Sequence, residues 1–294
     1  MKTTGTLLWI LLLQLQKSLG QLQVFNDEKT LHLPDSYNIG WMQTLHDDKS
    51  ISDITIPGTH DTMALYGGPL AECQAWSLMD QLKSGIRYLD LRVSEYDLHI
   101  MHGITYQHTS FPEVQKTIRD FLSNYPTEIV LVSVKPAFFF ETKVTDLVKR
   151  EIDSSISWVS SSVPRIGEVR GKIVYVQNSN FRLGVPLSET DEDGDYRVSR
   201  VEEKEEKIKN HLNHALETCR DGCVVLSFSS GTGLGTWMGA LRGLTPKRVA
   251  EEINPFLYNY LNENAKPQEP KTSFGIIAMD FPGTDLIQKI IYLN

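Results

Sequence analysis

The feature that most constrains the fold is the alternation of short apolar, β-branched runs with longer stretches of helical periodicity. The runs that we predict as strands cover residues 51–56, 86–93, 98–101, 128–134, 172–177, 223–229 and 274–280. The predicted helices cover residues 73–83, 111–124, 143–156, 201–217 and 246–261. Strands that alternate with helices favour a mostly parallel sheet with right-handed crossovers. At 294 residues, a closed barrel is the economical arrangement, so we predict an α/β fold, a single (β/α) TIM-type barrel of irregular geometry.

The first twenty residues differ from the rest of the chain. Lys2 precedes an apolar run over residues 7–13, and the small residues Ser18 and Gly20 follow it. This order is typical of a secretory signal peptide, and the run is shorter than the roughly 20 residues that a membrane span requires. We therefore predict a signal peptide over residues 1–20, cleavage near Gly20, one domain over residues 21–294, and secretion. No other stretch predicts a transmembrane segment.

Charge and cysteine content exclude some classes of function. The chain has 29 Lys and Arg against 37 Asp and Glu, for a net charge of -8. An acidic protein is a poor partner for a phosphate backbone, so we expect no nucleic-acid partner. Three cysteines are too few for a disulfide scaffold and lack the paired spacing of a zinc site. Cys219 and Cys223 could form a disulfide or remain ordinary thiols.

Ionisable side chains stand at or near the ends of several predicted strands, which is where an α/β barrel carries its active site. They are His60 and Asp61 after strand 51–56, Asp90 and Arg92 on one side of strand 86–93, His102 after strand 98–101, and Asp280 at the end of strand 274–280. Two histidines, several carboxylates and an arginine can supply a general base, a general acid, their orienting partners and a fixed positive charge. That set of groups suits cleavage of a phosphodiester.

The motifs around these residues resemble those of the secreted, bacterial-type phosphatidylinositol-specific phospholipase C family. They run in the family order from about residue 41 to the end of the chain, and so cover nearly all of it after the predicted signal peptide. The matching segments are Trp41-Met42-Gln43, 54–61 (ITIPGTHD), 81–92 (QLKSGIRYLDLR), Met101-His102-Gly103, 128–135, 171–174, 227–231, 253–255 and Asp280.

The resemblance implies a catalytic role for each strand-end residue. His60 matches the general base that takes the proton of the inositol 2-hydroxyl, and Asp280 matches the carboxylate that orients it. His102 matches the general acid that protonates the departing diacylglycerol oxygen, with Asp61 holding it. Arg92 would stabilise charge on the non-bridging phosphate oxygens.

Other positions match substrate and membrane contacts of the family. Asp90 would support Arg92 or the hydrogen bonding of the site. Lys135 and Tyr196 match positions that contact the inositol ring, whereas Asn178 stands where bacterial members have an arginine, which bears on the headgroup preference. Trp237, in the Gly-rich segment 231–239, matches a rim loop of the family that touches lipid. An aromatic ring suits that contact, because aromatic rings favour the membrane interface.

These residues favour one function over two alternatives. We expect a secreted phospholipase C that cleaves phosphatidylinositol, or its glycan-linked form, to diacylglycerol and an inositol cyclic phosphate at a membrane surface. Calcium prefers six to eight oxygen ligands, and no cluster of acids surrounds His60 in the sequence, so we expect no metal and no cofactor, with Arg92 in the place of a metal. The alternatives are a related barrel phosphodiesterase acting on another lipid diester, and a catalytically weak, secreted inositol-lipid-binding protein. The sequence does not predict an oligomeric state.

Overall fold

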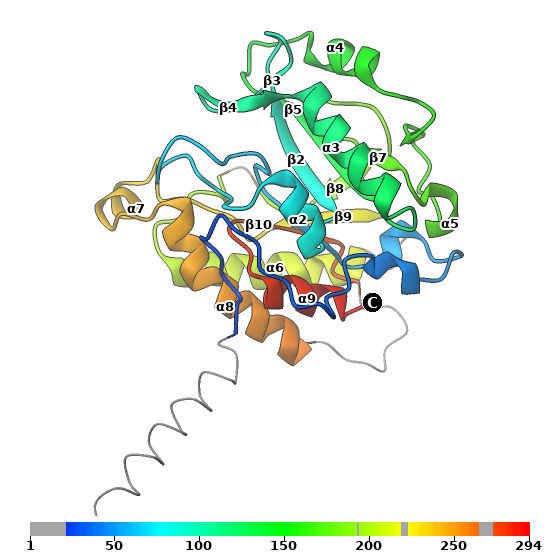
Figure 1. Cartoon of the computed structure of the whole chain (residues 1–294). Coiled ribbons are helices and arrows are strands. Elements are labelled where there is room, and N and C mark those ends of the chain that lie inside the picture. The colour runs from blue at the N-terminus through cyan, green and yellow to red at the C-terminus, as the bar shows by residue number, and fades with distance from the viewer. Residues whose placement is uncertain (1–21, 193, 219–222, 265–272) are drawn as a thin grey trace, which may run out of the picture.

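Parallel strands form the centre of the protein, whose computed structural model describes residues 22–192, 194–218, 223–264 and 273–294 (Figure 1). The strands are Ile56–Thr59 (β1), Tyr88–Val93 (β2), His99–His102 (β3), Thr105–Ser110 (β4), Val130–Pro136 (β5), Ser157–Trp158 (β6), Ile173–Val176 (β7), Leu187–Glu189 (β8), Val224–Phe228 (β9) and Ile276–Met279 (β10). They pair in the order β6-β7-β5-β2-β1-β10-β9-β8, and each neighbouring pair in this order is parallel.

Helices cover the outside of this curled sheet. They are Leu78–Ser84 (α2), Phe111–Asn124 (α3), Val144–Glu151 (α4), Ile166–Val169 (α5), Val201–Thr218 (α6), Trp237–Leu241 (α7), Pro246–Asn264 (α8) and Thr284–Ile291 (α9), with 3-10 helices at Trp41–Thr44 (η1) and Ile51–Asp53 (η2). In Figure 1, α6, α8 and α9 lie together on one side of the sheet, and α2 and α3 on another. Within the described residues, no helix combines the length and the apolar character needed to cross a bilayer.

The ring of strands is completed by a single bridge. Val185 pairs with Val176 at the end of β7, and the amide of Gln177 donates to the carbonyl of Val185 at 2.8 Å. Two residues later the chain enters β8, which pairs with β9. The segment from Val185 to β8 therefore links the two sides of the sheet through very few hydrogen bonds. The predicted irregular α/β barrel is confirmed.

Side chains at alternate strand positions face the inside of the barrel, where η1 and η2 fill the amino-terminal end. The interior cluster includes Trp41 and Met42 of η1, Ile51 of η2, and Ile56, Tyr88, Leu131, Val174, Leu226 and Ile276 of the strands. The intervening residues, such as Leu89, Val132 and Ile277, pack against the helices instead. Because this alternation has a period of two, Asp90 and Arg92 continue the interior column that begins at Tyr88. The carboxyl-terminal end of the interior is therefore polar.

Some predicted elements differ from the structure. Residues 51–53 form η2 rather than a strand, because the Ser50 side chain accepts a hydrogen bond from the amide of Ser52 and starts a helical turn. The predicted helix 73–83 begins only at α2, where Ser77 is the N-cap. The predicted strand 98–101 is β3, which forms an antiparallel hairpin with β4 beside the barrel. The predicted alternatives for Cys219 and Cys223 lie outside the described residues, because Cys219 is not described.

A buried ion pair stabilises the amino-terminal end of the barrel. Arg87 and Glu128 are fully buried, with Nη2 of Arg87 2.8 Å from Oε2 of Glu128. The same carboxylate accepts a hydrogen bond from the amide of Met42 in η1. Removal of one partner leaves the other charge buried and unpaired.

Glu128→Gln is therefore expected to lower the free energy of unfolding by about 3–5 kcal/mol, measured by denaturant unfolding. The exposed pair Lys116–Asp120 offers a control, because Lys116→Gln should change that free energy by less than about 1 kcal/mol. Equal effects of the two substitutions would contradict this account of the pair.

Candidate active site

A cavity of about 740 Å³ opens at the carboxyl-terminal ends of the strands. Most of the predicted site residues lie on its wall together with other polar and aromatic side chains. The wall includes His60, Asp61, Cys73, Arg92, His102, Lys135, Glu189, Asp191, Glu192, Tyr196, Phe228 and Asp280. The structure therefore brings residues from across the whole sheet to one place.

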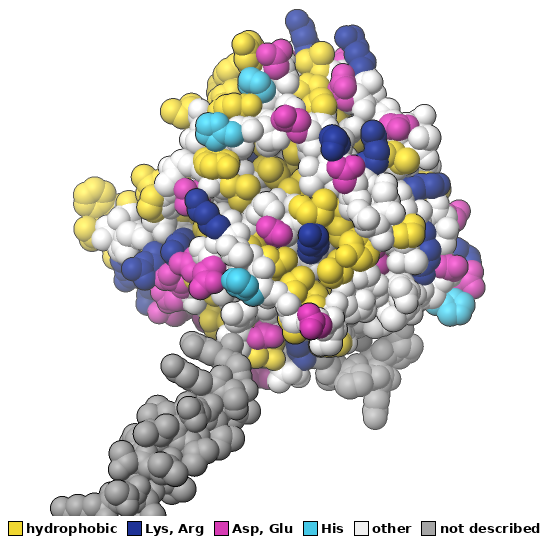
Figure 2. All heavy atoms as spheres, in the orientation of Figure 1, with side chains coloured by type: hydrophobic (Ala, Val, Ile, Leu, Met, Phe, Trp, Pro, Cys, Tyr) yellow, Lys and Arg dark blue, Asp and Glu magenta, His cyan; other side chains and the backbone are white. Residues whose placement is uncertain are grey.

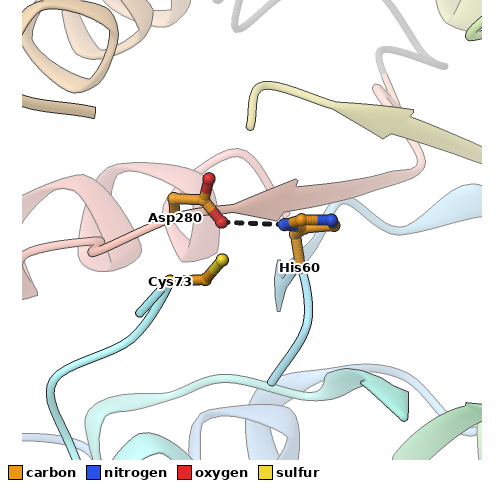
Figure 3. A group of neighbouring side chains, drawn as sticks. All are labelled: His60, Cys73 and Asp280. Carbon is orange, nitrogen blue, oxygen red and sulfur yellow. Dashed lines mark hydrogen bonds and ion pairs between the residues drawn. The ribbon is translucent and has the colours of Figure 1, made fainter. Parts of the chain in front are cut away.

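His60 and Asp280 form a hydrogen-bonded pair because of the strand register. Thr59 of β1 pairs with Met279 of β10, and the next residue of each strand is His60 or Asp280. Nδ1 of His60 lies 2.9 Å from Oδ1 of Asp280 (Figure 3). The side-chain amide of Gln74 donates to the carbonyls of His60 and Met279, at 2.8 Å each, and holds the two strand ends together.

Carboxylates around His60 change its acidity. Burial alone would lower the pKa of His60, but the charges of Asp61 and Asp280 outweigh burial and raise this pKa to about 9. Burial also raises the pKa of the Asp280 carboxyl, against the opposing effect of His60. A histidine with one nitrogen held by a carboxylate has the arrangement of a general base.

Asp61 lies at the centre of the cluster. Its Oδ2 is 3.3 Å from Nε2 of His60 and 3.2 Å from Nε2 of His102, and its Oδ1 is 2.7 Å from Nε of Arg92. The backbone of Asp61 has a φ of 38°, a left-handed conformation that is rare for a residue with a side chain. This turn lets consecutive residues, His60 and Asp61, both face the cavity.

His102 ends β3 and has both nitrogens engaged. Its Nδ1 donates to the carbonyl of Ala71 at 2.6 Å, which directs Nε2 to Asp61. Burial lowers the pKa of His102, but the hydrogen bond to Asp61 and the charge of that carboxylate raise it above its ordinary value. A histidine whose pKa is raised beside a cavity can act as a general acid.

Arg92 is held between two carboxylates. Its Nε contacts Asp61 at 2.7 Å and its Nη2 contacts Asp90 at 3.2 Å. The carboxylates raise the pKa of Arg92 despite its burial, so the guanidinium is a permanent positive charge. Asp90 is buried below Arg92, and the structure does not bring it to the cavity wall. Its contacts agree with a supporting role for Asp90.

The predicted headgroup residues divide into two groups. Lys135 and Tyr196 lie on the cavity wall, and Nζ of Lys135 is 3.7 Å from Glu189 and 5.3 Å from the ring centre of Phe228. Asn178 does not lie on the wall. Its side chain donates to the carbonyl of Val134 at 2.7 Å, and its Oδ1 accepts from the amides of residues 180 and 181. The side chain of Asn178 thus holds a loop, and its expected substrate-binding role stays a prediction.

Sequence reasoning missed several residues of the wall. Glu189, Asp191 and Glu192 come from the short strand β8 and the residues after it. Their signal is visible in hindsight, because the acidic run directly follows an apolar segment. Cys73 was missed for a different reason: it lies in a segment without regular secondary structure, before α2, and nothing in its spacing relates it to the histidines.

Comparison with known proteins relates the chain to one enzyme family. Residues 48–177 match the family model described as phosphatidylinositol-specific phospholipase C, X domain. A 1-phosphatidylinositol phosphodiesterase of Listeria monocytogenes is 28% identical over 286 residues, which cover 86% of this chain and 84% of that protein. One from Staphylococcus aureus is 24% identical over 86% of this chain and 93% of its own length.

Solved structures agree with the sequence matches. The phosphatidylinositol-specific phospholipase C of Listeria monocytogenes superposes with a TM-score of 0.75 at 26% identity, covering 87% of this chain and 98% of that one. The Staphylococcus aureus protein superposes with a TM-score of 0.72 at 23% identity over 87% and 97%, which supports the fold. The family model, the similar sequences and the Listeria structure together relate this chain to the phosphatidylinositol-specific phospholipase C family.

Proposed function

We propose that this protein cleaves phosphatidylinositol, or its glycan-linked form, to diacylglycerol and an inositol cyclic phosphate. The observation that carries the proposal is the arrangement around Asp61, whose carboxylate contacts His60, His102 and Arg92 on the wall of one cavity. Cleavage of a phosphodiester needs a general base, a general acid and a fixed positive charge, and this cavity holds all three. The similarity to bacterial 1-phosphatidylinositol phosphodiesterases supports the choice of substrate.

The proposed reaction is an intramolecular displacement at phosphorus. Neutral His60 takes the proton of the inositol 2-hydroxyl, and the oxygen forms a new bond to phosphorus while the bond from phosphorus to the diacylglycerol oxygen breaks. Protonated His102 gives its proton to the departing oxygen. Arg92 donates to the non-bridging oxygens, where its planar guanidinium matches their geometry. Asp280 keeps His60 in orientation and stabilises it once protonated.

Arg92 takes the role of a metal in this proposal. Two carboxylates that could otherwise bind a cation, Asp61 and Asp90, are already paired with the guanidinium. The charge that developing oxygens require is therefore supplied by a side chain that never loses its proton.

Phosphorus NMR tests the function directly. The purified protein is mixed with phosphatidylinositol in detergent micelles that contain a calcium chelator, beside His60→Ala as the control. A cyclic inositol phosphate signal that the control lacks supports the proposal. Turnover only after addition of calcium would contradict the role of Arg92. Absence of turnover in both conditions would favour another lipid diester or a protein that binds inositol lipids.

The pH dependence is expected to reflect both histidines. Because the pKa of His60 is raised to about 9 and only the neutral form is a base, kcat/KM for a soluble substrate with an aryl leaving group, which needs no proton from His102, should rise with pH up to that value. For a substrate with an alkyl leaving group, kcat/KM should fall again where His102 loses its proton. Asp280→Asn removes a carboxylate that raises this pKa, so the rising limb should move to lower pH and the maximum rate should fall. Asp120→Asn is the control, because Asp120 is exposed and pairs with Lys116 on α3. If the rising limb of the pH profile did not move in Asp280→Asn, the proposed effect of Asp280 on the pKa of His60 would be contradicted.

Membrane contact is assigned to α7. Trp237 is 82% exposed and Leu241 72% exposed, and Figure 2 shows hydrophobic side chains protruding over α7 at the left edge of the molecule. The preceding residues Gly231, Thr232 and Leu234 line the cavity, so lipid held by α7 would lie beside the proposed site.

Trp237→Ala is therefore expected to weaken binding to phosphatidylinositol vesicles about tenfold, since loss of roughly 1.5 kcal/mol of apolar burial corresponds to that factor. Its kcat on a soluble short-chain substrate should not change. Tyr292→Ala is the matched control, because Tyr292 is 79% exposed at the opposite end of the barrel, near the contact between Asn294 and Thr55. Equal loss in the two variants would contradict a contact through α7.

Secretion belongs to the same proposal. The predicted signal peptide, residues 1–20, lies outside the described residues, and the assignment of residues 21–294 to one catalytic domain remains a prediction. Expression of the full chain in a secreting cell, followed by mass spectrometry of the protein in the medium, tests both the export and the cleavage near Gly20. Retention of the uncleaved chain in the cell would contradict it.

A further inference from the structure

A thiol that the proposed reaction does not use lies in the cavity. Cys73 is 1% exposed, and its Sγ has only a weak contact with the carbonyl of Ala71, at 3.7 Å. The backbone fixes its position, because the amide of Cys73 donates to the carbonyl of Ala64 and its carbonyl accepts from the amide of Phe281. Figure 3 shows the sulfur directed toward the space between His60 and Asp280.

The three side chains have the spacing of metal ligands. The sulfur of Cys73, a ring nitrogen of His60 and a carboxylate oxygen of Asp280 all lie within 4.8 Å of one another. Thiolate, imidazole and carboxylate are the ligand types of zinc sites, and three protein ligands with one open position are typical of zinc at an active site. Soft thiolate disfavours calcium and magnesium, which prefer oxygen alone.

The charge of the cluster favours a cation once His60 has lost its proton. Asp61, Asp90 and Asp280 then contribute three carboxylates around the cavity end of β1 and β10, against the positive charges of Arg92 and of protonated His102. The open side of the proposed ligand set faces the cavity, where water or a phosphate oxygen could complete the coordination.

We propose that Cys73, His60 and Asp280 form a binding site for Zn²⁺ and related soft divalent cations, and that occupation of this site inhibits the enzyme. On binding, the Cys73 thiol and the protonated His60 ring each lose a proton to solvent, and the sulfur bonds to the metal. The metal takes the His60 nitrogen and the Asp280 oxygen, so the base is no longer available. The binding does not depend on the proposed function, whereas the inhibition rests on it.

Cobalt provides a readout that needs no catalysis. Co²⁺ is added to the protein in a Cys219→Ser/Cys223→Ser background, which removes the other two thiols. Saturable appearance of a thiolate-to-cobalt charge-transfer absorption at one equivalent, displaced by Zn²⁺ and not by Ca²⁺, is the expected result. The same absorption in Cys73→Ser, or none in the background protein, would overturn the site.

The assignment of His60 and Asp280 as the other two ligands is tested by the same cobalt titration. His60→Ala and Asp280→Ala should each weaken the absorption titration, while His102→Ala should leave it unchanged. This comparison is needed because Asp61, Cys73 and His102 form a second group with ligand spacing. Loss of the signal only in His102→Ala would overturn the assignment to His60 and Asp280. X-ray absorption of bound Zn²⁺ in the background protein should show one sulfur at about 2.3 Å, which requires no substitution of Cys73.

Inhibition is measured relative to the metal-free rate of each variant. Substitution of outer-sphere partners typically weakens metal binding by about 10–100-fold, so removal of the ligand itself should raise the inhibitory Zn²⁺ concentration by about 100-fold in Cys73→Ser. Serine keeps the size of the side chain and its contact with Ala71, and Cys73→Ala serves if the serine variant does not fold. An unchanged inhibitory concentration would overturn the inhibitory role. Cobalt binding without any turnover of the metal-free protein would instead contradict the proposed function and leave the site intact.

Discussion

Replacement of His60 by alanine is expected to lower kcat by about 10⁴-fold, at the upper end of the range for a general base. The effect is large because His60 is the nitrogen base of the cluster whose Nδ1 is held by Asp280, at 2.9 Å. Without it, the inositol hydroxyl must lose its proton to water. Single-turnover measurement on a soluble short-chain substrate separates this chemical step from membrane binding.

The control for His60→Ala is His46→Ala. The side chain of His46 is 84% exposed and pairs only loosely with Asp48 at 3.8 Å, so its removal should leave kcat unchanged. If His60→Ala retained a tenth or more of the wild-type rate while its unfolding curve stayed normal, His60 would not be the base.

The leaving group separates the two histidines. An aryl leaving group can depart without being protonated. A substrate that carries one should therefore restore much of the rate to His102→Ala. It should not restore His60→Ala, because the attacking hydroxyl still needs a base. The reverse result would exchange the two roles.

Strand periodicity predicted a large part of the site. Tyr88, Asp90 and Arg92 alternate with apolar residues, and this alternation correctly indicated that the two charged side chains face the same side of β2. The adjacency of His60 and Asp280 follows from the pairing of Thr59 with Met279. A parallel barrel brings its first and last strands together, so residues 220 positions apart could be expected at one edge.

The position of His102 could be predicted less well. Its strand, β3, has the apolar character of a barrel strand, yet it turns back and pairs antiparallel with β2 through Val93 and Ile100. Periodicity cannot distinguish a barrel strand from a hairpin strand of the same length. The hairpin nevertheless brings His102 to Asp61, so the role inferred from the family motif is compatible with a connection that the pattern did not predict.

Asn178 and Cys73 illustrate what the sequence could not provide. Asparagine at a strand end can line a cavity or hold a turn through its amide, and the contacts with Val134 and the amides of residues 180 and 181 select the turn. Cys73 reaches the site through an irregular segment, whose path is fixed by backbone hydrogen bonds with Phe281 and Ala64. Both placements depend on tertiary contacts that leave no periodic signal.

Arg92→Lys is expected to lower kcat/KM by about 10²–10³-fold, the usual cost of removing a donor that stabilises developing charge. Lysine keeps the positive charge but lacks the planar set of donors that can contact Asp61 and Asp90 and still face a phosphate oxygen. A large loss with the charge retained would therefore show that geometry matters beyond charge. Arg200→Lys is the matched control, because Arg200 is exposed and contacts only Glu203 at 3.8 Å among the ion pairs described.

Added calcium distinguishes this role of Arg92 from that of a metal site. If the guanidinium alone supplies the positive charge, a calcium chelator does not lower wild-type turnover, and calcium does not restore Arg92→Lys. Loss of wild-type activity with the chelator, or rescue of the variant by calcium, would mean that Asp61 and Asp90 bind a cation during turnover. Zinc should inhibit rather than activate, because its binding at Cys73 removes His60 from catalysis. A chelator that removes traces of zinc should therefore raise the wild-type rate. The responses to calcium and zinc therefore test two separate points: whether Arg92 alone supplies the positive charge, and whether a bound metal inhibits by occupying His60.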